Sequence, residues 1–363
     1  MLARGVALAF AVALAAAGSA AAATTVAEVA RPTPLSASKG RVVWSVYDPA
    51  TGMYALTVRA GGVTSTLPVR PRSVPFDADL GRDAHGATVA VYSRCAHEPA
   101  ASQTTALTLP RWETGRGCSL WSYDFATGAE RPIHTAERGG ASDFLPTIWG
   151  SRIAFARVYP RRRGARGRDL WLYVRALSGG RSVRVPGGPR GREDARGAPT
   201  GLDLRGRTLA FGWHWVARPF VGGVLTGARP FEVRVDTIGG GHRLIEREAD
   251  ADEITGSLLT APSISGGHVY YALTMQGDTS GSRFRRYDLA TGRHLQSPPS
   301  RSPPFPDVLV ATAADGRALY EVTRQNQYDV ETACPGVDPD RPAQCTIARV
   351  DPLTFSPGLT PGP

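Results

Sequence analysis

The sequence has almost no lysine, only four cysteines, and no stretch with the period of an amphipathic helix. Lys39 is the only lysine among 42 basic residues, and the formal net charge is +10. Arginine-rich composition also follows from a GC-rich genome, so the charge alone does not indicate a polyanionic partner. Because no segment repeats apolar residues at a spacing of about 3.6, a helical fold is excluded.

The sequence also lacks the usual catalytic and cofactor motifs. It contains no G-x-S-x-G elbow, no P-loop, no G-x-G-x-x-G after a strand and no H-E-x-x-H. Two groups of acids are close in sequence, Asp77, Asp79, Asp83 and Asp338, Asp340. They could contact Ca²⁺, but the terminal Glu of an EF-hand is missing, and Asp commonly caps turns. We therefore expect turn capping, no metal, no cofactor and no catalytic residue.

The N-terminus has the features of a secretory signal. Arg4 precedes the uncharged apolar run Val6–Ala17, and Ala21, Ala22 and Ala23 are the small residues that a signal peptidase requires. We expect a signal peptide over residues 1–23, cleavage near Ala23 and a secreted, extracytoplasmic protein; an uncleaved anchor is the alternative. No later segment is long and apolar enough to be a transmembrane helix. In an oxidising compartment the four cysteines are expected to form disulfides.

Six segments repeat one order of signals. Short Gly-containing turns precede six β-rich runs, which are 41–47, 87–92, 152–158, 207–213, 268–273 and 317–322. A second set of runs follows at 54–59, 119–124, 169–174, 231–236, 284–288 and 346–351. Most of these lead into turns such as Ala126-Thr127-Gly128 and Ala290-Thr291-Gly292, where Gly provides a positive φ. The spacing between units, roughly 46 to 65 residues, is close to that of four-stranded propeller blades.

This pattern of strand, Gly turn, strand and then YD-x-ATG resembles TolB-type or WD40-like six-bladed propellers of bacterial envelopes. It lacks the Gly-His and Trp-Asp signatures of true WD40 blades. The resemblance implies an all-β fold, a six-bladed β-propeller of four-stranded antiparallel blades, in one domain over residues 24–356. The expected blades are approximately 34–70, 75–135, 144–187, 198–247, 261–298 and 306–356. Seven blades, or a β-sandwich, are the alternatives.

One segment of the sequence could close the ring of blades. Residues 352–363 are rich in Pro and Gly, so the sixth blade lacks an outer strand, and we expect a disordered tail over 357–363. The β-like segment 24–30 precedes the first blade. We predict that it pairs as the outermost strand of the last blade; a disordered mature N-terminus is the alternative.

The cysteines occupy equivalent places in two repeats. Cys95 and Cys118 flank the loop between the second and third strands of the second unit, and Cys334 and Cys345 flank that loop in the sixth. Of the three possible pairings, this parallel favours Cys95–Cys118 and Cys334–Cys345.

The loops between second and third strands are long in four units, at 93–117, 159–168, 214–230 and 323–344. In a propeller they would share one face, where binding residues are often found. The candidate ligand surface comprises Arg161, Arg162, Arg163, Arg166, Arg168, Trp112 and His97. For the arginines, together with Arg157, a solvated loop is favoured over a binding site, and for Trp112 packing within its own loop is slightly favoured. Neutral loop insertion is the alternative to a binding face.

These observations favour a monomeric, non-enzymatic binding or scaffold protein that recognises a protein or an anionic envelope ligand, glycan or polyanion. Export argues against a nucleic-acid partner. The alternatives are a polysaccharide hydrolase or lyase with its site in the central channel, and a structural envelope protein without a small ligand. Acids converging on the channel would favour the enzyme.

Overall fold

The computed structural model of the chain describes residues 23–98, 116–135, 140–159, 170–185, 196–216, 231–248, 257–275, 282–298, 307–325, 345–350 and 353–357. Every regular element in these ranges is a β-strand. The strands follow one another as antiparallel meanders, each with a first, second, third and outer strand. The six predicted second strands coincide with strands of the structure to within a few residues at their ends.

The first three meanders cover the N-terminal half. They consist of β2 (Ser36–Ser38), β3 (Arg41–Asp48), β4 (Met53–Ala60) and β5 (Val63–Thr66); β6 (Asp79–Arg82), β7 (Thr88–His97), β8 (Arg116–Asp124) and β9 (Ala129–Ile133); and β10 (Ser142–Trp149), β11 (Arg152–Val158), β12 (Leu170–Ala176) and β13 (Val183–Arg184).

The remaining meanders cover the C-terminal half. They consist of β14 (Arg196–Arg205), β15 (Thr208–Val216), β16 (Phe231–Thr237) and β17 (His242–Glu248); β18 (Ser257–Leu259) with β19 (Ser263–Ser265), β20 (His268–Met275), β21 (Arg283–Asp288), β22 (His294–Gln296) and β26 (Ser356–Pro357); and β23 (Asp307–Asp315), β24 (Ala318–Gln325), β25 (Cys345–Val350) and β1 (Ala23–Val29).

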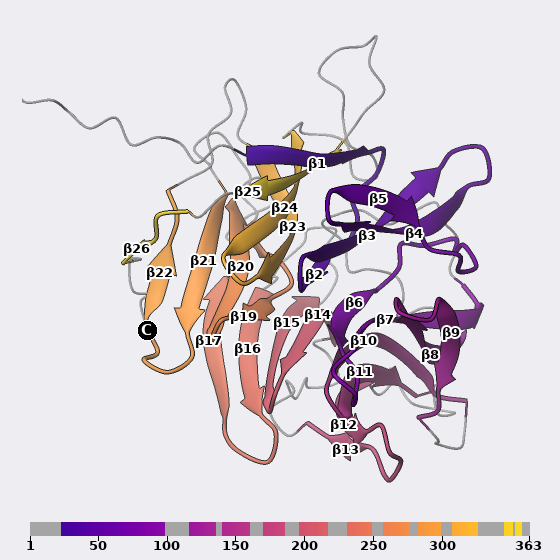
Figure 1. Cartoon of the computed structure of the whole chain (residues 1–363). Helices are drawn as coiled ribbons and strands as arrows, with labels where there is room; N and C mark the ends of the chain where they lie inside the picture. Colours follow the sequence, from indigo (N-terminus) through magenta and orange to yellow (C-terminus); the bar gives the residue numbers. More distant parts are fainter. Residues whose placement is uncertain are drawn as a thin grey trace, which may run out of the picture.

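The first strands form a closed circle. Each of β2, β6, β10, β14, β19 and β23 contacts the next, and β23 contacts β2. Figure 1 shows these strands near the centre of the molecule, with β1, β5, β9, β13, β17 and β22 at the periphery. Small antiparallel sheets radiating from a common axis define a β-propeller, so the predicted fold class is confirmed.

The hydrophobic core lies between the meanders. A cluster of buried apolar side chains fills each contact between neighbours, including the one that joins the sixth meander to the first. In the latter, Val29 from β1 packs with Trp44 from β3 and Ile347 from β25. A strand such as β11, buried from Ile153 to Val158, has apolar neighbours on both faces. Stacking therefore buries what a single four-stranded sheet would expose.

The predicted closing strand is confirmed. β1 pairs antiparallel with β25, with Ala23 opposite Val350 and Val29 opposite Cys345, and becomes the outermost strand of the last meander. The N-terminal segment thus completes a sheet whose other strands come from residues 307–350. The strand β1 thereby covers the edge of β25 and becomes the outer edge of that sheet, as β5 and β17 are in theirs.

The second and third meanders are hydrogen-bonded into one sheet. A single parallel pair, Trp149 with Arg82, joins β10 to β6. Gly81 permits this approach, because a Cβ atom there would lie 1.9 Å from the carbonyl oxygen of Ile148. A side chain at position 81 would therefore separate the two first strands.

The C-terminal segment departs from expectation. Residues 352–363 carry little strand signal, yet Ser356 and Pro357 form β26, which pairs with Gln296 and Leu295 of β22. Leu353 and Phe355 pack against the core between the fifth and sixth meanders. The packing of these two side chains, rather than a strand propensity of the sequence, holds the C-terminal segment against the propeller.

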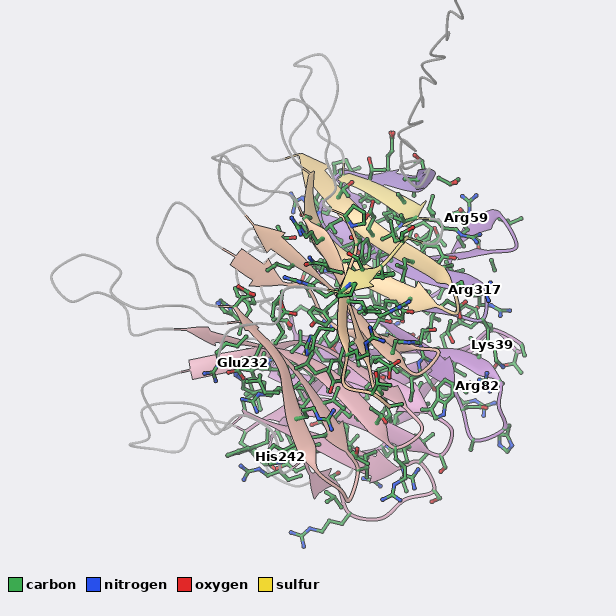
Figure 2. All side chains as sticks on the ribbon, turned by 90° about the vertical axis from the view of Figure 1, so that its left-hand side faces the viewer. Lys39, Arg59, Arg82, Glu232, His242 and Arg317 are labelled. Carbon is green, nitrogen blue, oxygen red and sulfur yellow. A yellow bond between two sulfur atoms is a disulfide. The ribbon has the colours of Figure 1, made fainter. Side chains whose placement is uncertain are left out.

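Strand alternation gives the propeller two different faces. The turns after first and third strands lie on one face, which we call the turn face. The ends of the second strands and the starts of the third strands lie on the other, which we call the loop face. Figure 2 shows Lys39, Arg82 and Arg317 on the turn face, and Glu232 near the opposite side. Among the described residues, no helix has the length and hydropathy needed to cross a membrane.

Candidate functional site

The loop face begins where the second strands end and the third strands start. The chain is described up to Glu98 and again from Arg116, and similarly on either side of residues 160–169 and 217–230. The Cys95–Cys118 disulfide joins opposing residues of β7 and β8 there, as predicted. Cys345 is also disulfide-bonded. Cys334 lies outside the described residues, so its pairing with Cys345 remains a prediction.

A buried ion cluster supports the first of these connections. Arg72, only 3% exposed, donates from Nη1 to Asp77 at 3.0 Å and from Nε to both carboxylate oxygens of Glu98 at 2.9 and 3.1 Å. Glu98 in turn accepts the backbone N–H of Cys95 at 3.3 Å. Buried charges persist only where they are paired in this way. The cluster therefore fixes the base of the connection that begins at residue 99.

The buried carboxylate of Asp77 accepts hydrogen bonds from several segments and does not cap a turn, contrary to the expectation from the sequence. Besides Arg72, its carboxylate accepts the backbone N–H and hydroxyl of Ser93, at 2.9 and 2.7 Å, and the N–H of Leu145 at 2.7 Å. Leu145 has a φ of +50°, a left-handed conformation that costs a non-glycine residue free energy. The Asp77 carboxylate thus joins the second and third meanders and helps to hold this unfavourable backbone.

A second buried pair lies below the next connection. Arg157 is 1% exposed and donates from Nε and Nη2 to the two oxygens of Asp143, at 2.6 and 2.7 Å. The residues are opposite each other on β11 and β10. The expectation that Arg157 belongs to a solvated arginine loop is therefore wrong, because its guanidinium neutralises a buried acid.

The fourth meander repeats this arrangement with an acid between two arginines. Glu232, 1% exposed at the start of β16, accepts Nε of Arg234 at 2.6 Å and Nε of Arg247 at 2.7 Å. Nearby, His214 is buried and its ring stacks on Phe231 at 3.9 Å between centroids. The ends of β15 and β16 that flank residues 217–230 are thus held by packing and charge.

A second polar group surrounds the propeller axis nearer the turn face. One residue from each of five first strands contributes, namely Ser36, Asp79, Thr147, Asp203 and Ser263. Several bond to the backbone of the next strand: Ser36 Oγ accepts Leu80 N–H at 2.9 Å, Thr147 Oγ1 accepts Leu204 N–H at 2.8 Å and Asp203 accepts Ile264 N–H at 2.6 Å. These bonds link neighbouring meanders around the axis.

Arg205 crosses the axis beside these acids. Its Nε donates to the carbonyl of Ile264 at 3.2 Å, and its Nη2 approaches the carbonyl of Ala37 at 3.5 Å. Since β14 and β2 lie on opposite sides of the circle, the side chain spans it. The guanidinium also lies 3.3 Å from Asp203 and 4.8 Å from the Trp149 ring centroid. Arg205 and its neighbours come from the first, third, fourth and fifth meanders. Asp79, which accepts the Ser36 hydroxyl, adds the second.

Asp79 is the acid with the most perturbed titration. Burial and, secondarily, the charge of Asp203 raise the pKa of Asp79 to about 7, although Arg205 opposes the shift. Its Oδ1 accepts the Ser36 hydroxyl at 2.7 Å, whereas Oδ2 has no hydrogen-bond partner among the described residues. A carboxyl that titrates near neutrality beside a second acid is an arrangement used in general acid–base catalysis.

The predicted ligand residues have different outcomes. His97 is exposed at the end of β7. Trp112, Arg161, Arg162, Arg163, Arg166 and Arg168 lie outside the described residues. Asp83 caps a turn, accepting His85 N–H and Ala87 N–H at 2.9 and 2.8 Å, whereas Asp77 and Asp79 are buried and connect meanders. Sequence spacing could not reveal the electrostatic interaction of Asp79 with Asp203 and Arg205, because only the circle of first strands brings these residues near one another. Within the described ranges, no three His, Cys, Asp or Glu residues form a metal-binding group.

The comparisons with known proteins add little to this geometry. No family model matches the sequence, and no curated protein matches it. Among solved structures, TolB from Acinetobacter baumannii is 14% identical with a TM-score of 0.43, and the match covers 87% of this chain and 65% of that one. A puromycin hydrolase is 14% identical with a TM-score of 0.46, covering 86% and 55%.

A third similar structure is an α-L-arabinofuranosidase of family GH93 from Fusarium graminearum, in complex with arabinobiose. It is 10% identical with a TM-score of 0.48, and the match covers 89% of this chain and 93% of that one. The chain spans only 50 to 65% of the first three structures that it matches. At TM-scores below 0.5, these similarities assign neither a ligand nor a reaction to this chain.

Proposed function

We propose that the six meanders are the six blades of an extracytoplasmic propeller that binds a macromolecular partner through its loop face. The observation that carries this proposal is the set of buried ion pairs at the bases of the long connections. Arg72 with Asp77 and Glu98, Arg157 with Asp143, and Glu232 with its two arginines hold strand ends on that face. A rigid base that presents long connections is how many scaffolds carry binding residues.

The extracytoplasmic location rests on the N-terminal segment 1–23 and on the Cys95–Cys118 disulfide, since disulfides persist in oxidising compartments. We propose a protein or an anionic envelope ligand as the partner. Arg161, Arg162 and Arg163 supply guanidinium groups that pair with carboxylate or phosphate, and Trp112 supplies a stacking surface.

The test is capture of a partner from the envelope fraction of the producing organism by the chain from Thr24 onward, followed by an affinity measurement with the purified partner. One bait carries Arg161→Gln, Arg162→Gln and Arg163→Gln. A matched bait carries Arg82→Gln, Arg152→Gln and Arg317→Gln on the turn face, so both lose three charges. We expect the first to bind at least about tenfold more weakly and the second to bind like the wild type.

Equal affinity of the two baits for the partner would remove the case for the loop face. A second loop variant, with residues 99–115 replaced by a short Gly-rich link between the paired cysteines, extends the test to Trp112. Thermal unfolding of each bait identifies any variant that has lost its fold.

A second candidate function is a polysaccharide hydrolase or lyase whose site lies on the axis. Asp79 and Asp203 favour it, because one carboxyl titrates near neutrality beside a second acid and an arginine. Release of reducing ends or unsaturated products from neutral and acidic polysaccharides tests this candidate. Asp79→Asn should abolish turnover and the turn-capping Asp83→Asn should not; turnover that persists in Asp79→Asn excludes this site.

A further inference from the structure

The turn face carries a repeated set of basic residues. Five of the six turns between first and second strands have an exposed Lys or Arg. The remaining turn, in the fifth meander, has His268 at the equivalent position. The set, which we call the basic ring, comprises Lys39, Arg41, Arg82, Arg152, Arg207 and Arg317; Arg41 is half-buried and the others are exposed. Figure 2 places Lys39, Arg82 and Arg317 on one side of the molecule.

Hydrogen bonds join the turns of several neighbouring meanders on this face. Lys39 Nζ donates to the carbonyl of Gly86 at 3.0 Å, and Gly316 N–H donates to Ser265 at 2.8 Å. Gly150 N–H donates to the carbonyl of Arg82 at 2.8 Å. The cations are therefore held around the axis by rigid turns rather than by long loops.

The partners of the basic ring leave its charge intact. Arg207 donates to the carbonyl of Ile238, Arg82 lies 4.9 Å from the Trp149 ring centroid and Arg41 lies 5.2 Å from that of Phe125. Among the described residues, no member of the ring forms an ion pair. By contrast, Arg72, Arg157 and Arg234 towards the loop face all neutralise buried acids. These three arginines are thus paired with acids, whereas the members of the basic ring are not.

Acids are present on the turn face, but their oxygens are engaged by backbone amides. Asp83, Asp124 and Asp288 each cap their own turn, and Asp315 accepts Gly40 N–H. Asp288 also faces His268 at 3.4 Å. Further arginines on this face, Arg181 and Arg293, follow the turns between third and outer strands. These carboxylates keep their negative charge, but the eight basic residues named on this face outnumber the four acids, so the sum of the named charges is positive.

Exposed apolar side chains accompany the cations at the rim. Val63 and Val183 are 70% and 65% exposed and are the first residues of β5 and β13, next to turns of this face. Leu244, 41% exposed, is the third residue of β17. No other large apolar side chain among the described residues reaches this exposure. Basic and exposed apolar residues on one blunt face are the features of a surface that docks on a membrane.

The start of β1 lies at the same face. Ala23 pairs with Val350, which pairs with Leu319, two residues after Arg317. The first described residue therefore lies on the side of the basic ring, and the predicted signal segment precedes it in the sequence.

We propose that the turn face is a docking surface for the anionic phospholipid headgroups of a membrane. The basic ring supplies electrostatic attraction to an anionic bilayer. Val63 and Val183 contact the interface between headgroups and acyl chains. This surface is opposite the one assigned to the macromolecular partner, so the chain can occupy both at once.

The test is flotation of the chain from Thr24 onward with vesicles of phosphatidylcholine alone or with 30% phosphatidylglycerol. We expect binding to the anionic vesicles only, and weaker binding as salt rises. Arg82→Gln with Arg152→Gln and Arg317→Gln should weaken it roughly 10- to 100-fold. The matched control, Arg70→Gln with Arg116→Gln and Arg283→Gln, loses the same charge towards the loop face and should bind like the wild type.

A third variant separates lipid from a dissolved polyanion. Val63→Ser with Val183→Ser should weaken vesicle binding several-fold while leaving binding to soluble polygalacturonate unchanged. Equal binding of the wild type to neutral and anionic vesicles, or equal loss in the two arginine triples, overturns the proposal. So does binding to the soluble polymer without binding to vesicles, which would make the ring a polysaccharide surface. None of these outcomes bears on capture of a partner by the loop face.

Discussion

Aspartate residues have different roles at the turns and near the axis of this molecule. Asp48, which is exposed, and Asp124 and Asp288, which are half-buried, open the repeated Asp-x-x-Thr-Gly turns. Each accepts backbone N–H groups of its own turn. These bonds hold the pKa of each carboxyl below its usual range. The glycine that ends each turn has a φ of 68° to 72°, which explains why glycine recurs there. Near the axis, Asp79 has no such set of amide donors, and its pKa rises instead.

The raised pKa of Asp79 predicts a particular dependence of stability on pH. Between the ordinary value of 3.8 and about 7, folded Asp79 holds a proton that the unfolded chain has released. The free energy of unfolding must therefore fall as pH rises through this window and level off above it. Asp79→Asn removes the titration. Its stability relative to the wild type should rise by a few kcal/mol at most between pH 4.5 and 8, measured by urea unfolding.

Asp83→Asn is the matched control for this measurement, since Asp83 is close in sequence but caps an accessible turn. Its stability relative to the wild type should not rise with pH over the same window. A constant difference between Asp79→Asn and the wild type from pH 4.5 to 8 would show that Asp79 is already ionised at pH 4.5.

At the scale of elements, the C-terminal segment acts as a fifth strand on the fifth meander. β26 contributes only two paired residues, so side-chain packing must supply most of its stability. Phe355 packs edge-on to Tyr270 at 6.2 Å between centroids, and the guanidinium of Arg286 lies 4.6 Å from its ring centroid. Leu353 packs with the same core. The segment thus covers the contact between the fifth and sixth meanders.

Phe355→Ala tests this interpretation. The substitution removes a half-buried ring and its contact with Arg286, so we expect a loss of about 1 to 3 kcal/mol in the free energy of unfolding. The exposed neighbour Thr354 provides the control, and Thr354→Ala should change stability by less than about 0.5 kcal/mol. Equal urea midpoints for the two variants would mean that the segment adds nothing to the core.

The sequence predicts elements well where local chemistry determines them. The second strands follow Gly turns and are rich in β-branched and aromatic residues, so β3, β7, β11, β15, β20 and β24 all coincide with predicted runs. Patterns of this kind do not report contacts between distant segments. The irregular pairing of β10 around Leu145 depends on Asp77 from another meander, and β26 depends on Tyr270 and Arg286. The sequence does not predict the axial cluster for the same reason, because Asp79 and Asp203 are 124 positions apart.

On the scale of the whole molecule, the circle is closed by pairing segments from opposite ends of the chain. The N-terminal strand β1 belongs to the sixth meander, where it covers the edge of β25. Its side chains continue the core that joins the sixth meander to the first, where Val29 is 3% exposed. The loop face and the basic ring both depend on this closure, since each is assembled from several meanders.

Deletion of residues 23–29 therefore tests the architecture as a whole. The truncated chain loses the pairing with β25 and the burial of Val29, and it exposes a strand edge beside an apolar core. We expect a loss of several kcal/mol in the free energy of unfolding, well above that of one surface substitution, and a lower melting temperature. A synthetic peptide of residues 23–29 should restore the melting temperature in a concentration-dependent manner, because it binds only the folded ring. The same peptide with Val29→Asp should not, since its carboxylate would be buried against Trp44 and Ile347. Unchanged melting of the truncated chain would mean that the contacts among the first strands close the circle without β1.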